Sequence, residues 1–295
     1  MRALVIINPI AGRTRRSLDT EGRVELARRV LGGLGVDAEV ATTERAGHAE
    51  ELARRAAADR CDVVFAWGGD GTVNEVARAV AFTTTALAII PAGSGNGLAR
   101  ALGVPRDPAV AMSRAVGLAG RRIDGGSING RFFANVCGVG LDAEVAWRFN
   151  QRQSRRRGPL PYVGLAIRAG LRYRALDYRL TLDGATEAAR ALIIAIANSP
   201  EYGNGAIVAP GAVADDGLLD VVVVEDRALV GRLLGARRLL AGSIIGAPGV
   251  RRRRARRIVI EADAPTLRFH VDGDPAEAEP ALVVVVHPAA LLIRA

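Results

Sequence analysis

The sequence predicts a doubly wound α/β domain followed by a β-sandwich. The chain has 295 residues, which is longer than one typical domain and is enough for two cores. In its first third, short β-rich runs alternate with helical stretches, a pattern typical of a parallel sheet with helices on both faces. After about Asp124, strand-like runs separated by turn residues predict a mostly antiparallel sandwich.

Alternating strands and helices are expected in the first domain, in chain order. Apolar runs predict strands at residues 4–7, 36–41, 62–67 and 87–90, and helical patterns lie within 13–33, 47–58 and 72–80. Ligands of such sheets bind at the carboxyl ends of the strands. The turns that follow the strands are therefore the places to look for a site.

The second domain is expected to consist mainly of strands. They are predicted at residues 132–136, 178–182, 191–197, 219–224, 257–261, 266–271 and 282–286, with helical stretches at 162–173 and 229–245. The second helical stretch gathers leucines roughly on one side and arginines elsewhere. This pattern fits a helix packed on the sandwich or one lying on a membrane surface.

Two glycine-rich turns follow the third and fourth predicted strands. The first reads Gly68-Gly69-Asp70-Gly71-Thr72 and the second reads Pro91-Ala92-Gly93-Ser94-Gly95-Asn96. Glycine lets the backbone approach an anion, and amides at a helix N-terminus attract it. Either turn alone fits an ordinary strand-to-helix connection equally well. Together, with a carboxylate in the first that is able to hold a metal ion, they favour nucleotide chemistry.

All 40 basic residues are arginine, so mechanisms that need a lysine ammonium are excluded. The net charge of +9 predicts attraction to polyanions, either nucleic acid or an anionic membrane. Arginines cluster at residues 152–157 and 251–257, where they form either solvated surface segments or contacts to phosphates or lipid headgroups. Neither cluster contains the aromatic residues that a single-strand stacking platform needs.

Other composition features point to the cytoplasm. Cys61 and Cys137 lack CxxC spacing, and three scattered histidines make a histidine-based metal site improbable. No apolar stretch reaches the ~18 to 20 residues that span a bilayer. Asn8-Pro9 ends the apolar start too early for a signal peptide. We expect a cytoplasmic protein, either soluble or peripherally bound to a membrane.

Five ordered motifs resemble the soluble lipid kinases, which include bacterial diacylglycerol kinases and eukaryotic sphingosine and ceramide kinases. They are residues 8–12 (NPIAG), 68–75 (GGDGTVNE), 91–100 (PAGSGNGLAR), 138–143 (GVGLDA) and 210–220, which contains Asp215-Asp216-Gly217. The first turn alone would also fit NAD kinases and phosphofructokinases. The resemblance implies an NAD kinase-like α/β catalytic domain that comprises residues 1–124 and, at the end of the chain, residues 288–295. It also implies a β-sandwich lipid-substrate domain at 125–287 and an active site in the cleft between the two domains.

The resemblance also implies a binding site for ATP and Mg²⁺. Asp70 would organise the Mg²⁺ ion, mainly through water, because magnesium dehydrates reluctantly. The residues expected to contact the nucleotide are Asn8, Gly12, Thr43, Gly68, Gly69, Asp70, Gly71, Thr72, Asn74, Glu75, Gly93, Ser94 and Asn96.

Phosphoryl transfer further needs a base for the proton of the acceptor hydroxyl. Asp272-Gly273-Asp274 resembles the family's Asp-Gly-Glu, so Asp274 is the preferred base and Asp272 the second choice, although aspartate is one methylene shorter than glutamate. The same residues also fit a plain Asp-Gly turn between strands. In sphingosine kinases the aspartate corresponding to Asp142 meets the polar head of the lipid. Asp124 is a further substrate candidate, and either aspartate could instead bind backbone amides.

A second metal position is implied at Asp216. Some bacterial members of the family hold a magnesium ion there, away from the phosphates, with backbone carbonyls at the positions of Val213 and Leu218. A structural role is expected for this ion, and the Asp-Gly spacing fits an ordinary turn as well.

The predicted function is ATP-dependent phosphorylation of a membrane lipid hydroxyl by an enzyme that docks on an anionic membrane surface. Gly93-Ser94-Gly95-Asn96-Gly97 lacks the final acid of bacterial diacylglycerol kinases and looks more like sphingosine and ceramide kinases. Diacylglycerol and a sphingoid base therefore both stay open. The alternatives are an NAD kinase-like or other small-molecule kinase, and a non-catalytic protein that binds anionic lipid or nucleic acid. No specific nucleic-acid partner is expected, and homodimer formation stays open.

Overall fold

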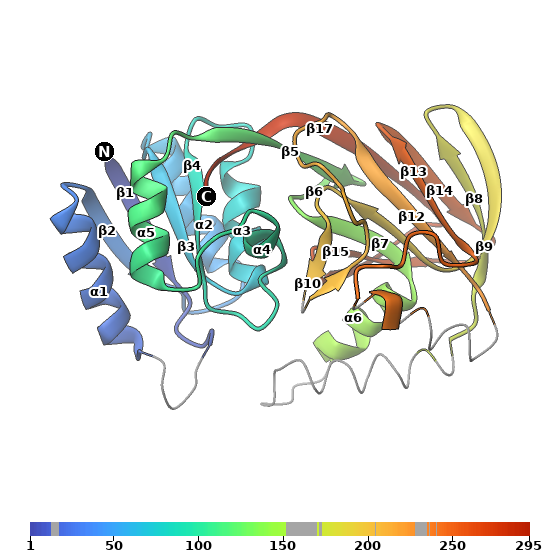
Figure 1. Ribbon diagram of the computed structural model, residues 1–295, viewed down its shortest axis with the longest axis horizontal. Helices are drawn as coiled ribbons and strands as arrows, with labels where there is room; N and C mark the ends of the chain where they lie inside the picture. Colours follow the sequence, from blue (N-terminus) through green and yellow to red (C-terminus); the bar gives the residue numbers. More distant parts are fainter. Residues whose placement is uncertain are drawn as a thin grey trace. The chain divides into compact units, whose positions relative to one another are not determined.

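The computed structural model describes residues 1–12, 18–151, 170, 173–203, 205–227, 235, 237–239 and 241–295 (Figure 1). The chain divides into two compact units. The first unit comprises Met1–Ile123 and Ala289–Ala295, and the second comprises Asp124–Pro288.

A parallel sheet forms the centre of the first unit. Its strand order is β2 (Asp37–Thr42), β1 (Arg2–Ile7), β3 (Val63–Gly68), β4 (Ala86–Pro91) and the last part of β17 (Ala281–Arg294). Ile293 and Arg294 of β17 pair in parallel with Leu87 and Ala88 of β4, so the chain end completes this sheet. The central strands are buried along nearly their whole length, as is typical of parallel sheets that are covered on both faces.

Five helices belong to this unit: α1 (Thr20–Gly33), α2 (His48–Ala58), α3 (Asp70–Val80), α4 (Gly97–Ala101) and α5 (Pro108–Gly117). Helices α1 and α5 pack together, as do α2 and α3, on opposite faces of the sheet (Figure 1). Asp19 caps α1, so this helix begins at Thr20, and residues 13–17 of the predicted stretch lie outside the described residues. Asp107 caps α5, which has Pro108 in its first turn.

The second unit is built from antiparallel strands. They are β5 (Arg121–Ile128, which begins in the first unit), β6 (Arg131–Phe133), β7 (Val136–Gly140), β8 (Leu176–Leu182), β9 (Ala185–Ala197), β10 (Glu201–Gly203), β11 (Ala206–Ile207), β12 (Leu219–Glu225), β13 (Val250–Ala255), β14 (Arg257–Ala262), β15 (Leu267–Val271), β16 (Asp274–Ala278) and the first part of β17. The main order is β16-β15-β7-β9-β8-β14-β17, while β12 pairs with β9 and β13. Residues on one face of these strands bury the main apolar core, and residues of β7, β9 and β12 on the other face belong to a second, smaller one. Helix α6 (Leu141–Gln151) follows β7 directly.

One predicted strand is wrong as a single element. Residues 132–136 are divided between β6 and β7, because the chain turns at Ala134 and Asn135. The carboxylate of Asp272, far away in the sequence, accepts the backbone N–H groups of Ala134, Asn135 and Val136 at 2.8–3.0 Å. A distant side chain therefore holds this turn, and the local sequence pattern does not reveal it.

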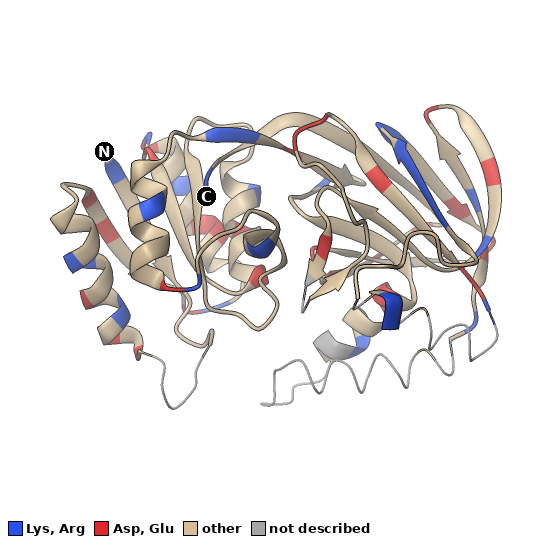
Figure 2. Ribbon diagram, in the orientation of Figure 1, with Lys and Arg blue, Asp and Glu red and all other residues tan. Residues whose placement is uncertain are grey.

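Most of the arginine cluster at residues 251–257 lies in β13, Arg256 lies between the strands, and Arg257 is the first residue of β14 (Figure 2). Three of its guanidinium groups meet carboxylates: Arg252 lies 2.5 Å from Asp220, Arg254 lies 3.4 Å from Asp216, and Arg251 lies 3.5–3.7 Å from Glu225 and Glu187. Half of this cluster is thus neutralised within the unit. The cluster at 152–157, ten of the twelve residues of the predicted helix at 162–173 and eight of the seventeen residues at 229–245 lie outside the described residues. Within the second stretch, residues 235 and 237–239 are helical, and residues 241–245 are not.

Candidate functional site

The two glycine-rich turns lie together at the carboxyl edge of the parallel sheet, and Asp70 joins them. Asp70 is the first residue of α3. Its Oδ2 accepts the Asn96 N–H at 2.8 Å, and its Oδ1 accepts the Gly97 N–H at 2.7 Å. A carboxylate at the start of one helix therefore satisfies the first amides of the next, α4, and fixes the distance between the turns.

The two turns also pack closely against each other through their backbones. A Cβ atom placed on Gly93 would lie 2.6 Å from the Cα of Gly69, so only glycine fits there. Asn96 has a left-handed backbone with φ +52°. Its side-chain amide accepts the Gly93 N–H at 3.0 Å and donates to the Gly93 carbonyl at 2.7 Å, which makes the second turn rigid.

The loop of residues 8–12 closes another side of this site. The Asn8 side chain donates to the Thr72 hydroxyl at 3.0 Å. Gly12 has φ +64°, and a Cβ there would lie 2.3 Å from the carbonyl oxygen of Ala92, so the loop touches the second turn. The structure brings residues 8–12, 68–72 and 93–97 together, as the sequence predicts for parallel strand ends.

Arg23 supports this loop and was missed by sequence reasoning. It is buried in α1 and donates to the carbonyl of Asn8 at 3.1 Å and to that of Ala11 at 2.7 Å. Its guanidinium also lies over the ring of Trp67. One arginine among several on a helix carries no distinguishing pattern, so only the fold reveals its role.

The N-terminus of α3 is open to an anion. Its cap residue is Gly69, no side chain of the described residues caps it, and a Cβ on Gly71 would meet nothing within 4 Å. Unpaired amides at a helix N-terminus bind phosphate groups. The Asp70 carboxylate at the same helix end would repel an anion unless a cation lay between them. This donor set, with the Thr72 hydroxyl nearby, fits a hard cation held largely by water.

Two of the residues predicted for the nucleotide lie outside this contact network. The Glu75 carboxylate accepts the N–H groups of Gly47 and Ala49 at 2.8 and 3.0 Å, so it caps α2. The Thr43 N–H donates to the Ile7 carbonyl at the carboxyl end of β1. Asn74 is buried in α3, and Ser94 is exposed in the second turn. Glu75 therefore has a clear structural role, whereas Ser94 is accessible at the site.

In the second unit, Asp272-Gly273 is the two-residue turn of the β15–β16 hairpin. Both residues have positive φ, +49° and +89°, as a type I′ turn requires. Three backbone N–H groups occupy the Asp272 carboxylate, and removal from water raises its pKa to about 6 in spite of them. Asp274 is exposed as the first residue of β16. Of the two base candidates, Asp272 thus holds the turn and Asp274 is the accessible carboxylate.

A buried polar cluster lies beside this turn. The Tyr202 hydroxyl donates to Asp142 Oδ2, and His270 Nε2 lies 2.8 Å from that hydroxyl and 3.1 Å from Asp142 Oδ2. Asp142 Oδ1 accepts the Ala143 N–H at the start of α6. A Cβ on Gly138 would lie 2.6 Å from Asp142 Oδ2, so this glycine makes room for the cluster. Both oxygens of Asp142 are thus engaged within the unit, and sequence reasoning missed His270 and Tyr202.

Asp124 is joined to the loop that Asp272 holds, because the side-chain amide of Asn198 donates to the carbonyls of Asp124 and Ala134 at 2.8 and 3.0 Å. Asp124 is buried, and its carboxylate accepts the Gly217 N–H at 2.7 Å. Asp216 accepts the Leu218 N–H at 3.0 Å and faces Arg254. With a guanidinium at its one carboxylate, the set of Asp216, Val213 and Leu218 does not fit a magnesium ion as it stands. Among the described residues, no three His, Cys, Asp or Glu side chains gather as metal ligands.

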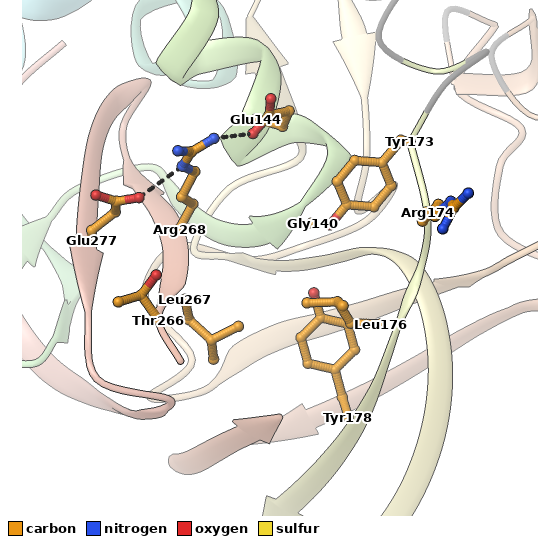
Figure 3. A pocket seen from close by; sticks show the side chains of 10 residues that line it. All are labelled: Gly140, Glu144, Tyr173, Arg174, Leu176, Tyr178, Thr266, Leu267, Arg268 and Glu277. Carbon is orange, nitrogen blue, oxygen red and sulfur yellow. Dashed lines mark hydrogen bonds and ion pairs between the residues drawn. The ribbon is translucent and has the colours of Figure 1, made fainter. Parts of the chain in front are cut away.

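A pocket of about 250 Å³ opens in the second unit (Figure 3). The rings of Tyr173 and Tyr178 and the side chains of Leu176 and Leu267 form its walls. The Tyr178 hydroxyl is buried, and this burial raises its pKa far above the ordinary value. At the rim, Arg268 bridges Glu144 and Glu277 at 2.7 and 2.8 Å, and Arg174 adds a positive charge.

Comparisons with known proteins cover both units. Residues 2–128 match the diacylglycerol kinase catalytic domain, and residues 135–295 match the YegS C-terminal NAD kinase beta sandwich-like domain. A Mycobacterium tuberculosis protein named diacylglycerol kinase is 33% identical over 88% of this chain and 85% of its own length. A Pseudomonas fluorescens protein named probable lipid kinase YegS-like is 31% identical over 99% of this chain and 95% of its own.

Solved structures agree on the fold. A diacylglycerol kinase structure from Bacillus anthracis has a TM-score of 0.73 at 20% identity, and a second structure from that organism has a TM-score of 0.80 at 23% identity. Each covers 99% of this chain and 96% of the other chain. The predicted α/β domain followed by a β-sandwich is therefore confirmed. No helix of the described residues has the length and apolar character needed to cross a membrane.

Proposed function

Since the chain belongs to the family of diacylglycerol kinases and YegS-like lipid kinases, we propose that it transfers the γ-phosphoryl group of ATP to the hydroxyl of a membrane lipid. The observation that carries the proposal is the pair of glycine-rich turns joined by Asp70 beside the open N-terminus of α3. This arrangement suits a phosphate chain in a protein whose relatives are named as lipid kinases.

The first unit would bind the nucleotide. The amides at the start of α3 face the phosphates, and the contact of Gly69 with Gly93 lets the backbone of both turns approach them. Because the chain has no lysine, these amides replace the ammonium that many kinases use. A Mg²⁺ ion near Asp70 and Thr72 would neutralise the charge of the phosphates when it is bound.

The second unit would bind the acceptor. Asp274 is the proposed base because it is exposed to solvent and stands at the acidic third position of the Asp-Gly-Glu motif that the family resemblance implies. The role of this base is to take the proton of the lipid hydroxyl as that oxygen attacks the γ-phosphorus.

Diacylglycerol is the acceptor that we propose. A sphingoid base carries a cationic amine and calls for a carboxylate with an available oxygen. At Asp142, which the family resemblance places at the lipid head, Ala143, Tyr202 and His270 already occupy both oxygens. An uncharged headgroup makes no such demand. The pocket beside Gly140, with its leucine and tyrosine walls, offers this headgroup and the first part of its chains an amphipathic surface.

A lipid acceptor also requires contact with a membrane, and the charge of the chain supports a peripheral contact. The net charge is +9, and the guanidinium groups of Arg253, Arg256 and Arg257 have no carboxylate partner among the described residues. Near an anionic surface, each exposed basic residue contributes about 1 kcal/mol of attraction. We therefore propose that the protein acts at the surface of anionic membranes.

Phosphorylation in mixed micelles tests the proposal. Purified protein is incubated with Mg²⁺ and γ-labelled ATP and is offered diacylglycerol, sphingosine, ceramide or monoacylglycerol, with NAD in a separate reaction. Label on diacylglycerol is expected. Label on sphingosine alone would contradict the argument from Asp142, and label on NAD alone would contradict the lipid kinase assignment. Absence of label from every acceptor would favour a non-catalytic binding protein.

A further inference from the structure

We propose that Asp142, His270 and Tyr202 form a positioning cluster that holds the Asp272-Gly273-Asp274 turn, with His270 as the link between them. This proposal rests on the proposed role of Asp274 as the base, and it adds two residues, His270 and Tyr202, that neither the sequence pattern nor the family resemblance points to.

The two ring nitrogens of His270 face different partners. Nδ1 accepts the Gly273 N–H at 3.3 Å, and Nε2 lies 2.8 Å from the Tyr202 hydroxyl and 3.1 Å from Asp142 Oδ2. Because a backbone N–H can only donate, Nδ1 must carry no proton. The proton of the neutral ring is then on Nε2, where a carboxylate and a hydroxyl oxygen are available to accept it.

The cluster is a built arrangement of four elements. His270 is 1% exposed on β15 and Asp142 is 9% exposed at the start of α6, while Tyr202 reaches them from β10. Gly138 of β7 lies opposite His270 in the sheet register and leaves the space that Asp142 and the imidazole fill. Satisfied polar networks of this kind make a local structure rigid and specify one conformation.

A second contact holds α6 over β15. Arg268, two residues before His270, pairs with Glu144 at 2.7 Å, and its guanidinium lies 4.7 Å from the centre of the Trp147 ring. The helix that carries Asp142 is therefore fixed to the same strand at two points. Asp142 is thereby held beside the imidazole.

The hairpin turn depends on this anchor. The Asp272 carboxylate binds the amides of residues 134–136 on one side, and His270 binds the Gly273 N–H on the other. Asp274 follows Gly273 directly, so a rotation of the peptide between them would change the direction in which the Asp274 carboxylate points. Catalysis is sensitive to displacements of this size, since ~1 Å of misplacement costs about 100-fold in rate.

Two substitutions of His270 separate its two contacts. In His270→Asn, the amide oxygen takes the place of Nδ1 and still accepts the Gly273 N–H. In His270→Gln, the longer amide reaches towards Asp142 but leaves the Gly273 N–H without its acceptor. We expect His270→Gln to lower kcat for the lipid by about 10- to 100-fold with KM for ATP unchanged. His270→Asn is expected to retain most of the wild-type kcat.

His287→Gln is the matched control. His287 also lies in the second unit, and its Nε2 is 2.8 Å from the Ser127 hydroxyl, away from the cluster. Its substitution is expected to leave kcat unchanged. Equal losses of kcat in His270→Asn and His270→Gln would overturn the proposal, and so would wild-type kcat in His270→Gln.

Nuclear magnetic resonance tests the cluster without any lipid. The chain has three histidines, so long-range ¹H–¹⁵N spectra of the ¹⁵N-labelled wild type are simple to assign by substitution. His270 is expected as the Nε2–H tautomer, and the Gly273 amide is expected to exchange slowly in the wild type and in His270→Asn but fast in His270→Gln. An Nδ1–H tautomer would overturn the proposal. If the wild type phosphorylates no lipid, the proposed function fails, while these spectra still decide the geometry of the cluster.

Discussion

The contact between the two glycine-rich turns predicts that Gly93→Ala damages nucleotide binding. In the structure the new Cβ would lie 2.6 Å from the Cα of Gly69, and ordinary contact begins at 3.4 Å, so the backbones must separate by about 0.8 Å. Overpacking of this kind costs about 1–3 kcal/mol of stability. A displacement near 1 Å between groups that hold one phosphate chain costs about 100-fold in rate. We therefore expect kcat/KM for ATP to fall by about two orders of magnitude.

Gly32→Ala is the control for this change. Gly32 lies in α1 of the same unit, and a Cβ there would meet nothing within 4 Å. Alanine should stabilise this helix by about 0.5–1 kcal/mol and leave ATP binding unchanged. Calorimetric titration with Mg²⁺ and a non-hydrolysable ATP analogue, combined with thermal unfolding, measures both effects. Wild-type affinity in a folded Gly93→Ala variant would refute the view that these turns hold the phosphates.

Three further predictions concern other parts of the molecule. Asp70→Asn should lower kcat by about 100-fold and destabilise the protein by about 1 kcal/mol in urea unfolding, because one of its two backbone N–H partners loses its acceptor. The pKa of Asp272, about 6, is above its ordinary value, so the folded state binds this proton more tightly than the unfolded state does. The stability that results is present at about pH 4 and is lost as the pH rises through 6. When unfolding is followed from pH 4 to 7, this loss should be absent in Asp272→Asn. Thr266→Trp at the rim of the pocket should raise KM for the lipid and leave KM for ATP unchanged, whereas Asp263→Trp, outside the pocket lining, should change neither in micelle kinetics.

Local patterns were sufficient to predict most of the first unit. The expected strand at 62–67 corresponds to β3 at Val63–Gly68, and the expected helix at 72–80 corresponds to α3, which begins two residues earlier at Asp70. Buried apolar runs and turn residues define these elements within a few residues of sequence. The meeting of the two turns also follows from the rule that parallel strand ends share one edge. The short helix α4 and helix α5 were not predicted as separate elements.

Long-range contacts explain what the sequence could not reveal. The arginine run of Val250–Ala255 reads locally as a charged surface segment, but it pairs along its full length with β12. Three of its four arginines, Arg251, Arg252 and Arg254, pair with carboxylates of Asp216, Asp220, Glu187 and Glu225, and Glu187 lies more than sixty residues away in the sequence. Four consecutive arginines do not reveal which carboxylate on another strand each one meets, because the pairing depends on the sheet register.

The same limit applies to the site in the second unit. The Asp-Gly pair predicts a hairpin turn, and the structure contains one, but nothing in the local sequence indicates that Asp272 turns inward to three amides while Asp274 stays exposed. His270 and Tyr202 lie 68 residues apart and meet only because β10 and β15 converge on α6. Their joint role is a property of the fold.

The most direct test of the proposed function compares the wild type with Asp274→Asn. It measures the transfer of label from γ-labelled ATP to diacylglycerol and, for each protein, the affinity for ATP. The account predicts a labelled lipid product from the wild type and a loss of about 100-fold or more in Asp274→Asn, because general-base catalysis contributes about 10² to 10⁴ in rate. ATP affinity should be equal in both proteins. Equal rates of lipid labelling in the two proteins would contradict the role of Asp274, and a wild type that binds ATP but labels no lipid would contradict the proposed function.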